Sequence, residues 1–384
     1  SISDVPLGAF LSGGVDSSAI VSLMQREATQ PVKTFTIGFE DPEYDESKYA
    51  LEVANHLGTD HSELIVTSED ALSIIPDLPE IYDEPFADSS QIPTYFVCKS
   101  AKQEVTVALS GDAGDELFGG YNRHITAPIL WKKINWLPFP ARKTLGRMLM
   151  SIPISKWDGI INSIPGKSKP SFLHFGDKVH KTASRLNNVK SIDDLYRSLL
   201  EEPDIDSLVA ESSDSHPIFL DDPLPLIKMD DPSSRMMFRD IQSYLTDDIL
   251  CKVDRAAMSV SLETRVPFLD HKIVELAWRI PLSMKIKGDE GKSILRNILY
   301  KNVPKSLIER PKAGFSIPLA EWLRDPLRDW AEALLDPSRL DTEGYLNSDY
   351  IQIIWREHLE GKKNWTNRLW SILMFQSWLD QSAK

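Results

Sequence analysis

The sequence predicts an α/β protein with a parallel sheet at its centre and a largely helical C-terminal part. Strand-like apolar segments alternate with helix-like segments from Val5 to Leu109, which is the pattern of βαβ units in a parallel sheet. The first of these strands runs straight into a glycine-rich turn. From Ser234 onward the hydrophobic periodicity is that of helices.

Four strands and four helices are expected in the N-terminal part. The strands are predicted at Val5–Leu11, Val32–Ile37, His61–Val66 and Val105–Leu109. The helices are predicted at Ser18–Gln30, Glu46–Leu57, Ser68–Ile75 and Pro93–Gln103. Gly58 fits a helix C-cap, and Ser68 fits an N-cap. We predict that this unit, residues 1–130, is a nucleotide-binding core.

Two further regions complete the predicted organisation. Residues 131–233 are rich in Pro, Ser, Lys and Asp and are interpreted as a helical or irregular insertion, with helical pieces such as Ile192–Leu200. Residues 234–384 are expected to form a helical part that completes the domain. Its helices are predicted at Ser234–Leu250, His271–Ile280, Lys292–Tyr300, Pro318–Leu335 and Thr366–Asp380.

The composition indicates an acidic globular chain. Its 384 residues are 42% hydrophobic and 26% charged, with a formal net charge of −14, which argues against nucleic acid as a partner. No apolar run approaches the ~20 residues of a membrane helix, so we expect neither a signal peptide nor membrane contact. The only cysteines, Cys98 and Cys251, lack C-x-x-C spacing, which predicts a reducing, cytoplasmic location without a zinc or iron–sulfur site.

The turn after the first predicted strand is suited to hold phosphates. Its two glycines remove Cβ atoms, so a phosphate can approach the backbone, and the following helix N-terminus favours negative charge. Asp16 is the one residue of this turn that would repel a phosphate, so a carboxylate here requires a cation between them. Mg²⁺ is the expected cation, because it usually takes one or two carboxylates together with substrate phosphates. The alternative is a serine–glycine turn without a ligand. The residues that we expect to face the phosphates are Ser12, Gly13, Gly14, Asp16 and Ser17.

A second glycine-containing segment, Gly288–Ser293, has the sequence Gly-Asp-Glu-Gly-Lys-Ser. It is not a Walker A loop, because its glycines lie three residues apart instead of five and Ile286 stands where the first glycine should be. Lys292 therefore has two interpretations. It reaches the bound phosphates, or it is a solvated residue at the start of a helix.

A polar turn also follows the fourth predicted strand, in the segment Ser110–Tyr121, which contains three carboxylates within five residues. These acids at a helix start can simply complement the helix dipole. However, two carboxylate loops at strand ends can share one divalent ion. We therefore predict that Asp16 and Asp115 bind the metal together.

Four motifs, in this order along the chain, resemble the synthetase domain of glutamine-dependent asparagine synthetases. They are Ser12–Ser17, Ser110–Tyr121, Leu262–Asp270 and Arg310–Phe315. The first is similar to the pyrophosphatase loop (PP-loop) of enzymes that split ATP into AMP and pyrophosphate, including β-lactam synthetase, GMP synthetase and argininosuccinate synthetase. The last two motifs favour the asparagine synthetase and β-lactam synthetase branch. The resemblance implies a PP-loop core of the adenine nucleotide alpha hydrolase-like fold.

The resemblance further implies an AMP-forming ligase that makes an amide. The carboxylate of aspartate attacks the α-phosphorus of ATP, pyrophosphate leaves, and ammonia derived from glutamine displaces AMP to give asparagine. Asp16 and Asp115 would contact Mg²⁺ and pyrophosphate, and Lys312 would supply positive charge to the α-phosphate. The positions that match the adenosine site are Leu11, Ile37, Ser110 and Gly111.

One position departs from the family pattern. Asparagine synthetases commonly carry Glu, in a loop with the sequence Ser-Gly-Glu-Gly-Ser-Asp-Glu, where this chain has Asp112. In the family this carboxylate serves the intermediate and the incoming ammonia, so Asp112 is predicted to be catalytic together with Lys312. Its shorter side chain leaves two substrates open: aspartate, or another acid such as a sugar acid, a peptide or a cyclising substrate. Arg265 and Arg123 are candidates for the anchor of the substrate carboxylate.

The resemblance also implies partners. The family has an N-terminal glutaminase domain with an N-terminal cysteine nucleophile, whereas this chain begins at Ser1. We expect the natural protein to extend upstream into such a domain, which would pass ammonia through a channel, and a homodimer is a further expectation. Alternative functions are an inactive nucleotide-binding module, which the intact Asp16, Asp115 and Lys312 argue against, and a PP-loop tRNA-modifying enzyme, which the acidity and the missing cysteine pair argue against.

Overall fold

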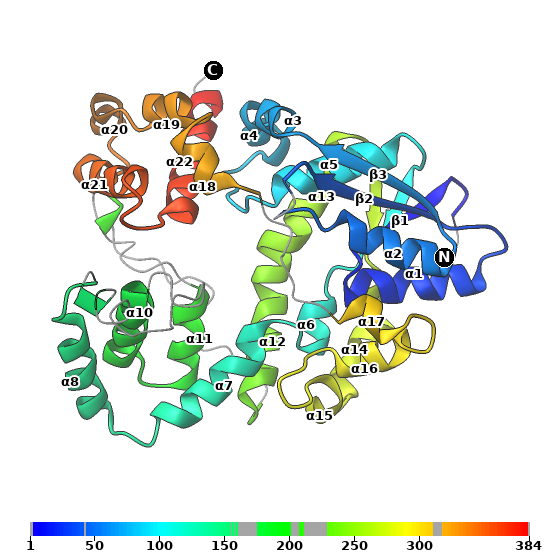
Figure 1. The fold of residues 1–384 in the computed structure, drawn as a ribbon, viewed down its shortest axis with the longest axis horizontal. Coiled ribbons are helices and arrows are strands. Elements are labelled where there is room, and N and C mark those ends of the chain that lie inside the picture. Colours follow the sequence, from blue (N-terminus) through cyan, green and yellow to red (C-terminus); the bar gives the residue numbers. More distant parts are fainter. Residues whose placement is uncertain are drawn as a thin grey trace. The chain divides into compact units, whose positions relative to one another are not determined.

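The computed structural model describes residues 3–41, 44–154, 156, 157, 159, 175–200, 207–210, 229–309 and 317–382 (Figure 1). The chain divides into two compact units. The core unit comprises Ser1–Gly120, Asp204–Phe219 and Phe238–Lys384, and the helical unit comprises Tyr121–Pro203 and Leu220–Met237. The division at residues 130 and 233 that the sequence suggested stays a prediction.

A parallel sheet of five strands forms the centre of the core unit, which confirms the predicted fold class. In space the strands lie in the order β3 (Asp60–Val66), β2 (Lys33–Phe39), β1 (Leu7–Phe10), β4 (Val107–Leu109) and β5 (Glu263–Arg265). The chain leaves β1 toward β2 on one side and later returns to place β4 on the other side. Open α/β sheets bind ligands outside the carboxyl ends of their strands at such a switch point. Both predicted phosphate-site loops begin there, one after β1 and one after β4.

The sequence did not predict β5. This strand is three residues long and lies inside the segment Leu262–Asp270, so it is too short to show a strand periodicity. Its pairing with β4 is nevertheless regular, and the hydrogen bond from Ser110 N to Arg265 O, at 2.8 Å, continues it beyond the end of β4. Pairing with β5 therefore holds the backbone of Ser110, the first residue of the loop after β4.

Helices cover both faces of the sheet (Figure 1). On one face α1 (Val15–Glu27), α2 (Ser47–Leu57) and α16 (Ser293–Leu299) share a hydrophobic cluster with Ala9 and Leu11 of the first strand region. On the other face α5 (Gln91–Lys102) and α13 (Cys251–Ser259) share a cluster with β2. Residues of a strand point alternately to the two faces, which explains why neighbours in β1 join different clusters.

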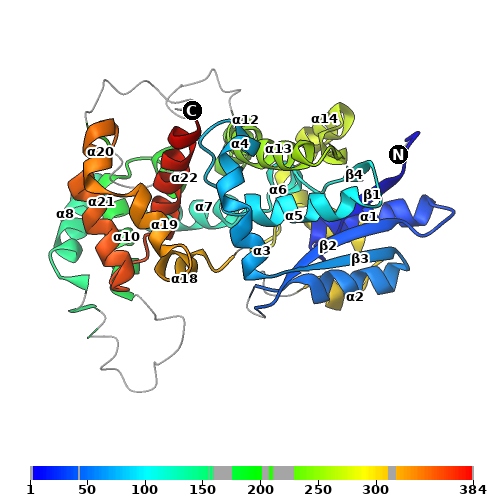
Figure 2. The same ribbon diagram turned by 90° about the horizontal axis from the view of Figure 1, so that it is seen from above.

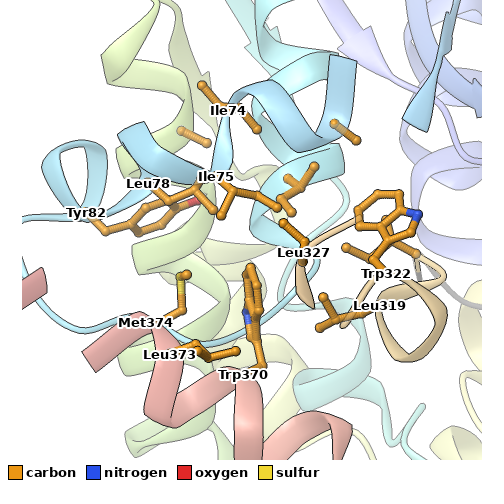
Figure 3. Close-up of a cluster of buried hydrophobic side chains, with 14 of the residues drawn as sticks. Ile74, Ile75, Leu78, Tyr82, Leu319, Trp322, Leu327, Trp370, Leu373 and Met374 are labelled. Atoms are coloured by element: carbon orange, nitrogen blue, oxygen red, sulfur yellow. The ribbon is translucent and has the colours of Figure 1, made fainter. Parts of the chain in front are cut away.

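The C-terminal helices α18 (Leu319–Arg324), α19 (Arg328–Leu334) and α22 (Thr366–Ser382) lie beside α3 (Ser68–Ser73) and α4 (Leu78–Tyr82) (Figure 2). A cluster of buried side chains joins them: Tyr82 and Leu78 pack with Trp370 and Leu373 of α22, and Trp322 lies at the same cluster (Figure 3). Tyr82 and Trp370 are among the largest fully buried side chains of the described chain. This burial of aromatic area fixes the C-terminal helices to the sheet region.

Two predicted helices are interrupted. Pro318–Leu335 is not one helix but α18 and α19, because Pro326 cannot continue a helix and disfavours helical backbone at Asp325. Ser234–Leu250 consists of α12 (Pro232–Gln242), which begins in the helical unit and continues into the core unit, and a π-helical segment, Tyr244–Leu250. The sequence did not predict α13, which follows the π-helical segment directly.

The remaining helices are short connections or bundles. In the core unit they are α6 (Gly114–Phe118), α14 (His271–Arg279), α15 (Leu282–Lys285), α17 (Lys305–Ile308), α20 (Pro337–Glu343) and α21 (Ser348–Leu359). In the helical unit they are α7 (Asn122–Ile134), α8 (Phe139–Met150), α10 (Phe175–Asn188) and α11 (Ile192–Leu200), of which α11 has the predicted bounds. The helical unit has its own core around Leu195, Tyr196 and Met236. Within the described ranges, no helix is both long and apolar enough to cross a membrane.

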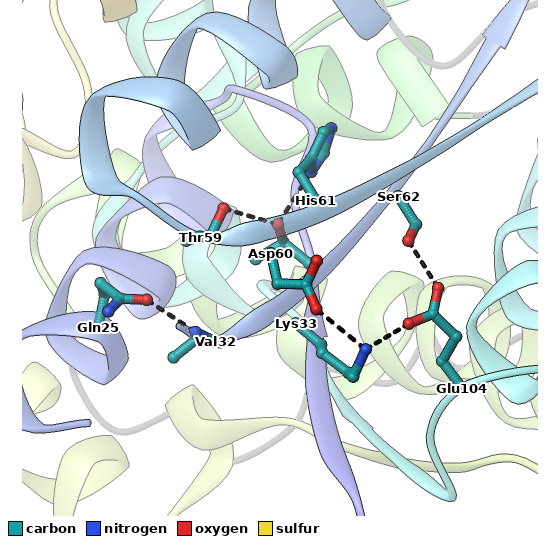
Figure 4. Close-up of polar contacts among 9 residues, drawn as sticks. Gln25, Val32, Lys33, Thr59, Asp60, His61, Ser62 and Glu104 are labelled. Atoms are coloured by element: carbon teal, nitrogen blue, oxygen red, sulfur yellow. Dashed lines mark hydrogen bonds and ion pairs between the residues drawn. The ribbon is translucent and has the colours of Figure 1, made fainter. Parts of the chain in front are cut away.

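At the amino ends of the strands, a polar network joins three neighbouring segments (Figure 4). Lys33, at the start of β2, pairs with Asp60 at 3.0 Å and with Glu104, which precedes β4. Ser62 Oγ donates to the same Glu104 carboxylate at 2.6 Å. These groups are substantially exposed and lie at the edge of the sheet opposite the carboxyl ends, so we assign them to stability.

Candidate functional site

The loop after β1 is held by its own hydroxyl groups. Ser12 N donates to Ser17 Oγ at 3.2 Å, and the two side-chain oxygens lie 3.0 Å apart. Gly13 has a φ of 71°, a left-handed conformation that favours glycine. The helix begins at Val15 rather than at Ser18 as predicted, so Asp16 and Ser17 lie in the first turn of α1. The backbone N–H groups of this turn therefore lie at a helix N-terminus, where anions commonly bind.

The loop after β4 lies directly against the loop after β1. A Cβ built on Gly111 would lie 2.8 Å from Ser17 N, and one built on Gly114 would overlap the Asp16 carboxylate. Neither glycine has a positive φ, so the reason for glycine here is the close approach of the other loop and not backbone conformation. The two predicted carboxylate loops thus meet at the switch point of the sheet.

A buried lysine joins the two loops. Lys292, the residue before α16, forms ion pairs with Asp16 and with Asp115, the latter at 2.6 Å. Its side chain is 3% exposed, so it is not a solvated residue at a helix start. Burial by itself would lower the pKa of Lys292, but the charges of Asp16 and Asp115 outweigh burial and raise that pKa above its ordinary value. The ammonium group is therefore a permanent cation between the two carboxylates.

Small residues around Lys292 allow this approach. A Cβ on Gly120 would overlap both Lys292 and the Asp115 carboxylate, and one on Gly291 would overlap Gly119 O. Lys292 N donates to Phe118 O at 3.0 Å, which ties the segment before α16 to the end of α6. Lys292 itself has a φ of 58°, an uncommon conformation for a residue with a side chain. Such conformations persist only where the surroundings impose them.

The donor set fits a metal ion that arrives with a nucleotide. Among the residues that the structure describes, no group of three or more His, Cys, Asp or Glu side chains is arranged to hold a metal ion. The pair Asp16 and Asp115 supplies two carboxylates, and Mg²⁺ typically takes one or two carboxylates together with phosphate oxygens. The charge of Lys292 compensates this pair in the protein chain itself. The two carboxylates therefore fit Mg²⁺ only as part of a Mg²⁺–nucleotide complex.

Asp112 lies in the same loop, three residues before Asp115. Its carboxylate accepts a hydrogen bond from Ser110 Oγ. Burial raises the pKa of Asp112, while the Ser110 hydrogen bond and the positive charge of Lys252 act in the opposite direction. A buried carboxyl group whose pKa is raised holds a proton more readily than an exposed one, which favours a role in acid–base chemistry.

The structure does not bring all predicted site residues together. Leu11 packs in the cluster with α1, whereas Ile37 packs in the cluster with α5, so their side chains lie on opposite faces of the sheet. Arg265 is half exposed and pairs with Glu263. Arg123 belongs to the helical unit, where it stacks over Tyr121 at 4.0 Å from the ring centre. Lys312 lies outside the described residues.

One polar cluster of the core unit was only partly visible in the sequence. Lys252 Nζ donates to Asp88 Oδ2 at 2.7 Å and to Ser90 Oγ at 2.8 Å. Asp248 is hydrogen-bonded to Asp88, and burial followed by the charge of Asp88 raises the pKa of Asp248 to about 7. The acidic loop with Asp88 precedes a predicted helix. Asp248 lies inside the predicted helix Ser234–Leu250, whereas Lys252 lies beyond its predicted end. Their i, i+4 spacing was the only signal.

Comparison with known proteins agrees with this geometry. The family model described as asparagine synthase matches residues 1–380. The chain belongs to the asparagine synthase family. The resemblance inferred from the four motifs is thereby confirmed, since the match extends over nearly the whole chain.

Several curated relatives carry the same family name. The chain is 32% identical over 378 residues to the glutamine-hydrolyzing asparagine synthetase 1 of Bacillus subtilis, covering 98% of this chain and 56% of that protein. It is 33% identical over 386 residues to a putative glutamine-hydrolyzing asparagine synthetase of Mycobacterium tuberculosis, covering 98% and 54%. A bovine glutamine-hydrolyzing asparagine synthetase is 23% identical over 399 residues, covering 96% and 52%. The chain thus spans about half the length of these relatives.

Proposed function

We propose that this chain is the ATP-dependent, amide-forming part of a glutamine-hydrolysing asparagine synthetase. The carboxylate of aspartate attacks the α-phosphorus of ATP, and the bond to pyrophosphate breaks. Ammonia then attacks the carbonyl carbon of the β-aspartyl adenylate, AMP leaves, and asparagine forms with loss of a proton. Family membership and the names of the relatives support the reaction class.

One observation carries the proposal: Asp16 and Asp115 come from two loops that meet at the switch point and share Lys292. A site for pyrophosphate needs backbone N–H donors, carboxylates for the metal and a cation. The turn at the start of α1 supplies the donors, the two aspartates would hold Mg²⁺, and Lys292 supplies the cation. When bound, Mg²⁺ neutralises charge on the phosphate oxygens.

The remaining predicted residues have roles that depend on this proposal. Lys312 supplies charge to the α-phosphate, and Asp112 serves the adenylate and the incoming ammonia. Leu11, Ile37, Ser110 and Gly111 are proposed to surround the adenosine. An upstream glutaminase domain as the source of ammonia, a cytoplasmic location and a homodimer belong to the same proposal.

Isotope exchange between ATP and pyrophosphate tests the first step without ammonia. With aspartate and Mg²⁺, the chain should transfer label from pyrophosphate into ATP, because formation of the adenylate is reversible. The variant Lys312→Ala should lose this exchange while it retains ATP binding. Exchange that fails with every carboxylic acid, although ATP still binds, would show that the chain is not a ligase of this type.

Asp112 favours a second candidate, a related amidotransferase that acts on another carboxylic acid. Its side chain is one methylene shorter than the Glu common at this position, which shifts the reach of the carboxylate by about an ångström. Exchange with a sugar acid or a peptide acid, but not with aspartate, would establish this alternative. In that case Asp112→Glu should increase the exchange that aspartate supports.

A further inference from the structure

A basic segment lies within this acidic chain. From Leu117 to Trp157 the sequence has seven Lys or Arg residues and no Asp or Glu, whereas the whole chain has a formal net charge of −14. The rest of the chain therefore carries −21. Such an uneven distribution of charge is typical of proteins that contact an anionic surface. Most of the segment forms α7 and α8 of the helical unit.

The cations at the end of α7 are not neutralised within the protein. Lys132 and Lys133 are exposed in the last turn of this helix, and no ion pair of the described residues involves either of them. The same helix exposes Ile129, one turn before Lys133. Trp136 follows the helix and is 74% exposed, and its Nε1 donates to Lys133 O at 2.8 Å, which holds the indole ring at the end of α7. Apolar and basic side chains therefore lie next to one another at this end of the helix.

The next helix, α8, also exposes apolar side chains. One of its faces packs on α10, because Gly146 is buried and a Cβ on it would lie 2.7 Å from Ala183 O. Met148 is two residues, or about 200°, further around the helix and therefore faces away from α10. Met148 is 62% exposed, Leu145 one turn earlier is 42% exposed, and Arg147 beside them is exposed as well. Figure 1 shows α8 at one edge of the helical unit with α10 beside it.

We propose that the end of α7 and the exposed face of α8 form a docking surface for a membrane that contains anionic phospholipids. The lysine and arginine side chains pair with the anionic headgroups, while Trp136, Leu145 and Met148 enter the boundary between headgroups and acyl chains. The same membrane repels the acidic rest of the chain, which orients the helical unit toward the lipid. This docking does not depend on the proposed amide-forming reaction.

The exposed aliphatic side chains favour a membrane over nucleic acid. Both partners attract lysines through phosphate groups. Nucleic acid, however, is bound mainly by polar side chains and by aromatic rings that stack on bases, so Leu145 and Met148 contribute little to such a contact. A lipid interface gains free energy from every apolar side chain that it removes from water. The expectation of no membrane contact rests on the lack of a spanning segment, which a peripheral contact does not need.

Co-flotation with lipid vesicles tests the charges of the docking surface. The wild-type chain should float with vesicles of equal parts phosphatidylserine and phosphatidylcholine, but not with phosphatidylcholine alone, and added NaCl should reduce the floating fraction. The double variant Lys132→Gln, Lys133→Gln should lower the partition coefficient about 25-fold, since each cation near such a membrane contributes about fivefold. The matched control is Lys99→Gln, Lys102→Gln, which removes two cations from the last turn of α5 in the core unit and should float like the wild type.

The apolar part of the docking surface is tested in the same assay. Met148→Gln should lower the partition coefficient about fivefold. Its control is Met258→Gln, since Met258 is 59% exposed in α13 of the core unit and should not contribute. Urea unfolding shows whether each variant is folded. A wild type that does not float, or a lysine variant that floats like the wild type, refutes the docking surface. An effect of the lysine variant that Met148→Gln does not share would assign the cations to polyanions such as nucleic acid, and it would also refute the proposal.

Discussion

Lys292 Nζ lies 2.6 Å from Asp115 Oδ1 in a place where the lysine side chain is 3% exposed. Asp16 contacts the same ammonium group from the other loop. The three residues therefore form a buried group in which one ammonium group pairs with two carboxylates. Lys33 has the same connectivity at the opposite edge of the sheet, with Asp60 and Glu104, but its side chain is 37% exposed. Each lysine pairs with two carboxylates, so a comparison of Lys292 with Lys33 measures how burial changes the contribution of such a group to stability.

Lys292→Met should destabilise the protein and weaken ATP binding. Removing the cation takes a buried ion-pair partner from both carboxylates, and breaking a buried pair in this way costs about 3–5 kcal/mol. Lys33→Met should cost at most about 1 kcal/mol, because exposed ion pairs contribute little. Urea unfolding gives the free energies, and titration calorimetry gives the affinity for Mg²⁺–ATP. Equal destabilisation by the two variants would contradict a special role for the buried cation.

Gly111→Ala should separate the two loops and lower the rate of pyrophosphate exchange by at least tenfold. The added Cβ would lie 2.8 Å from Ser17 N, and a backbone atom cannot move away as the end of a flexible side chain can. The matched control is Gly159→Ala, since a Cβ there meets no atom within 4 Å among the residues that the structure describes. Initial rates of exchange at saturating ATP and acid measure the effect. A variant with wild-type rates would show that the loops tolerate a displacement.

The meeting of Asp16 and Asp115 was predictable from the sequence. Each follows a continuous apolar run, and the ends of parallel strands lie at one edge of a sheet. The burial of Lys292 was not predictable in the same way. It depends on a contact across 276 positions of the chain and on glycines that admit the side chain, neither of which a local pattern contains. Local periodicity left Lys292 with two interpretations, and only the packing of Gly120 and Gly291 decides between them.

The errors in the fold have a similar origin. The strand β5 is too short to show alternation, and its place in the sheet comes from pairing with β4. The π-helical segment Tyr244–Leu250 has the composition of a helix, so its change of phase is not visible in a hydrophobic pattern. Asp248 lies in this segment and interacts with Asp88. The sequence therefore predicted the two loops with Asp16 and Asp115 better than the polar cluster around Lys252.

Asp248→Asn should make the protein more stable at alkaline pH. Burial, followed by Asp88, raises the pKa of Asp248 to about 7, so the folded state holds a proton that the unfolded state loses near pH 4. The contribution of Asp248 to wild-type stability should therefore fall as pH rises from about 4 to about 7 and stay constant above that. The Asp248→Asn variant cannot ionise at this position, so it does not lose this part of its stability as pH rises. Its advantage in melting temperature should be small near pH 4 and reach a plateau above pH 7. An advantage that is independent of pH would contradict the assignment to ionisation.

Arg296 should act as a positioning residue for Lys292. Its Nε donates to Gly291 O at 3.0 Å and its Nη1 to Tyr300 OH at 3.1 Å, and it also pairs with Glu309. It thus ties the segment before α16 to the residue before the Arg310–Phe315 motif. A lysine keeps the charge but cannot make these separate contacts with one ammonium group. Arg296→Lys should raise the KM for ATP about fivefold or more, with little change in kcat, because binding geometry is lost and not a reacting group.

The control for Arg296 is Arg279→Lys. Arg279 pairs with Glu275 at 3.3 Å, but its side chain is 77% exposed, so this substitution should leave the KM for ATP unchanged. Pyrophosphate exchange at varied ATP concentration separates KM from kcat in both variants. A structural role of Arg296 would lower the amount of active protein and hence kcat, while the KM for ATP would stay the same. Only a shift in KM that Arg279→Lys does not share supports the positioning of Lys292 through the Gly291 carbonyl group.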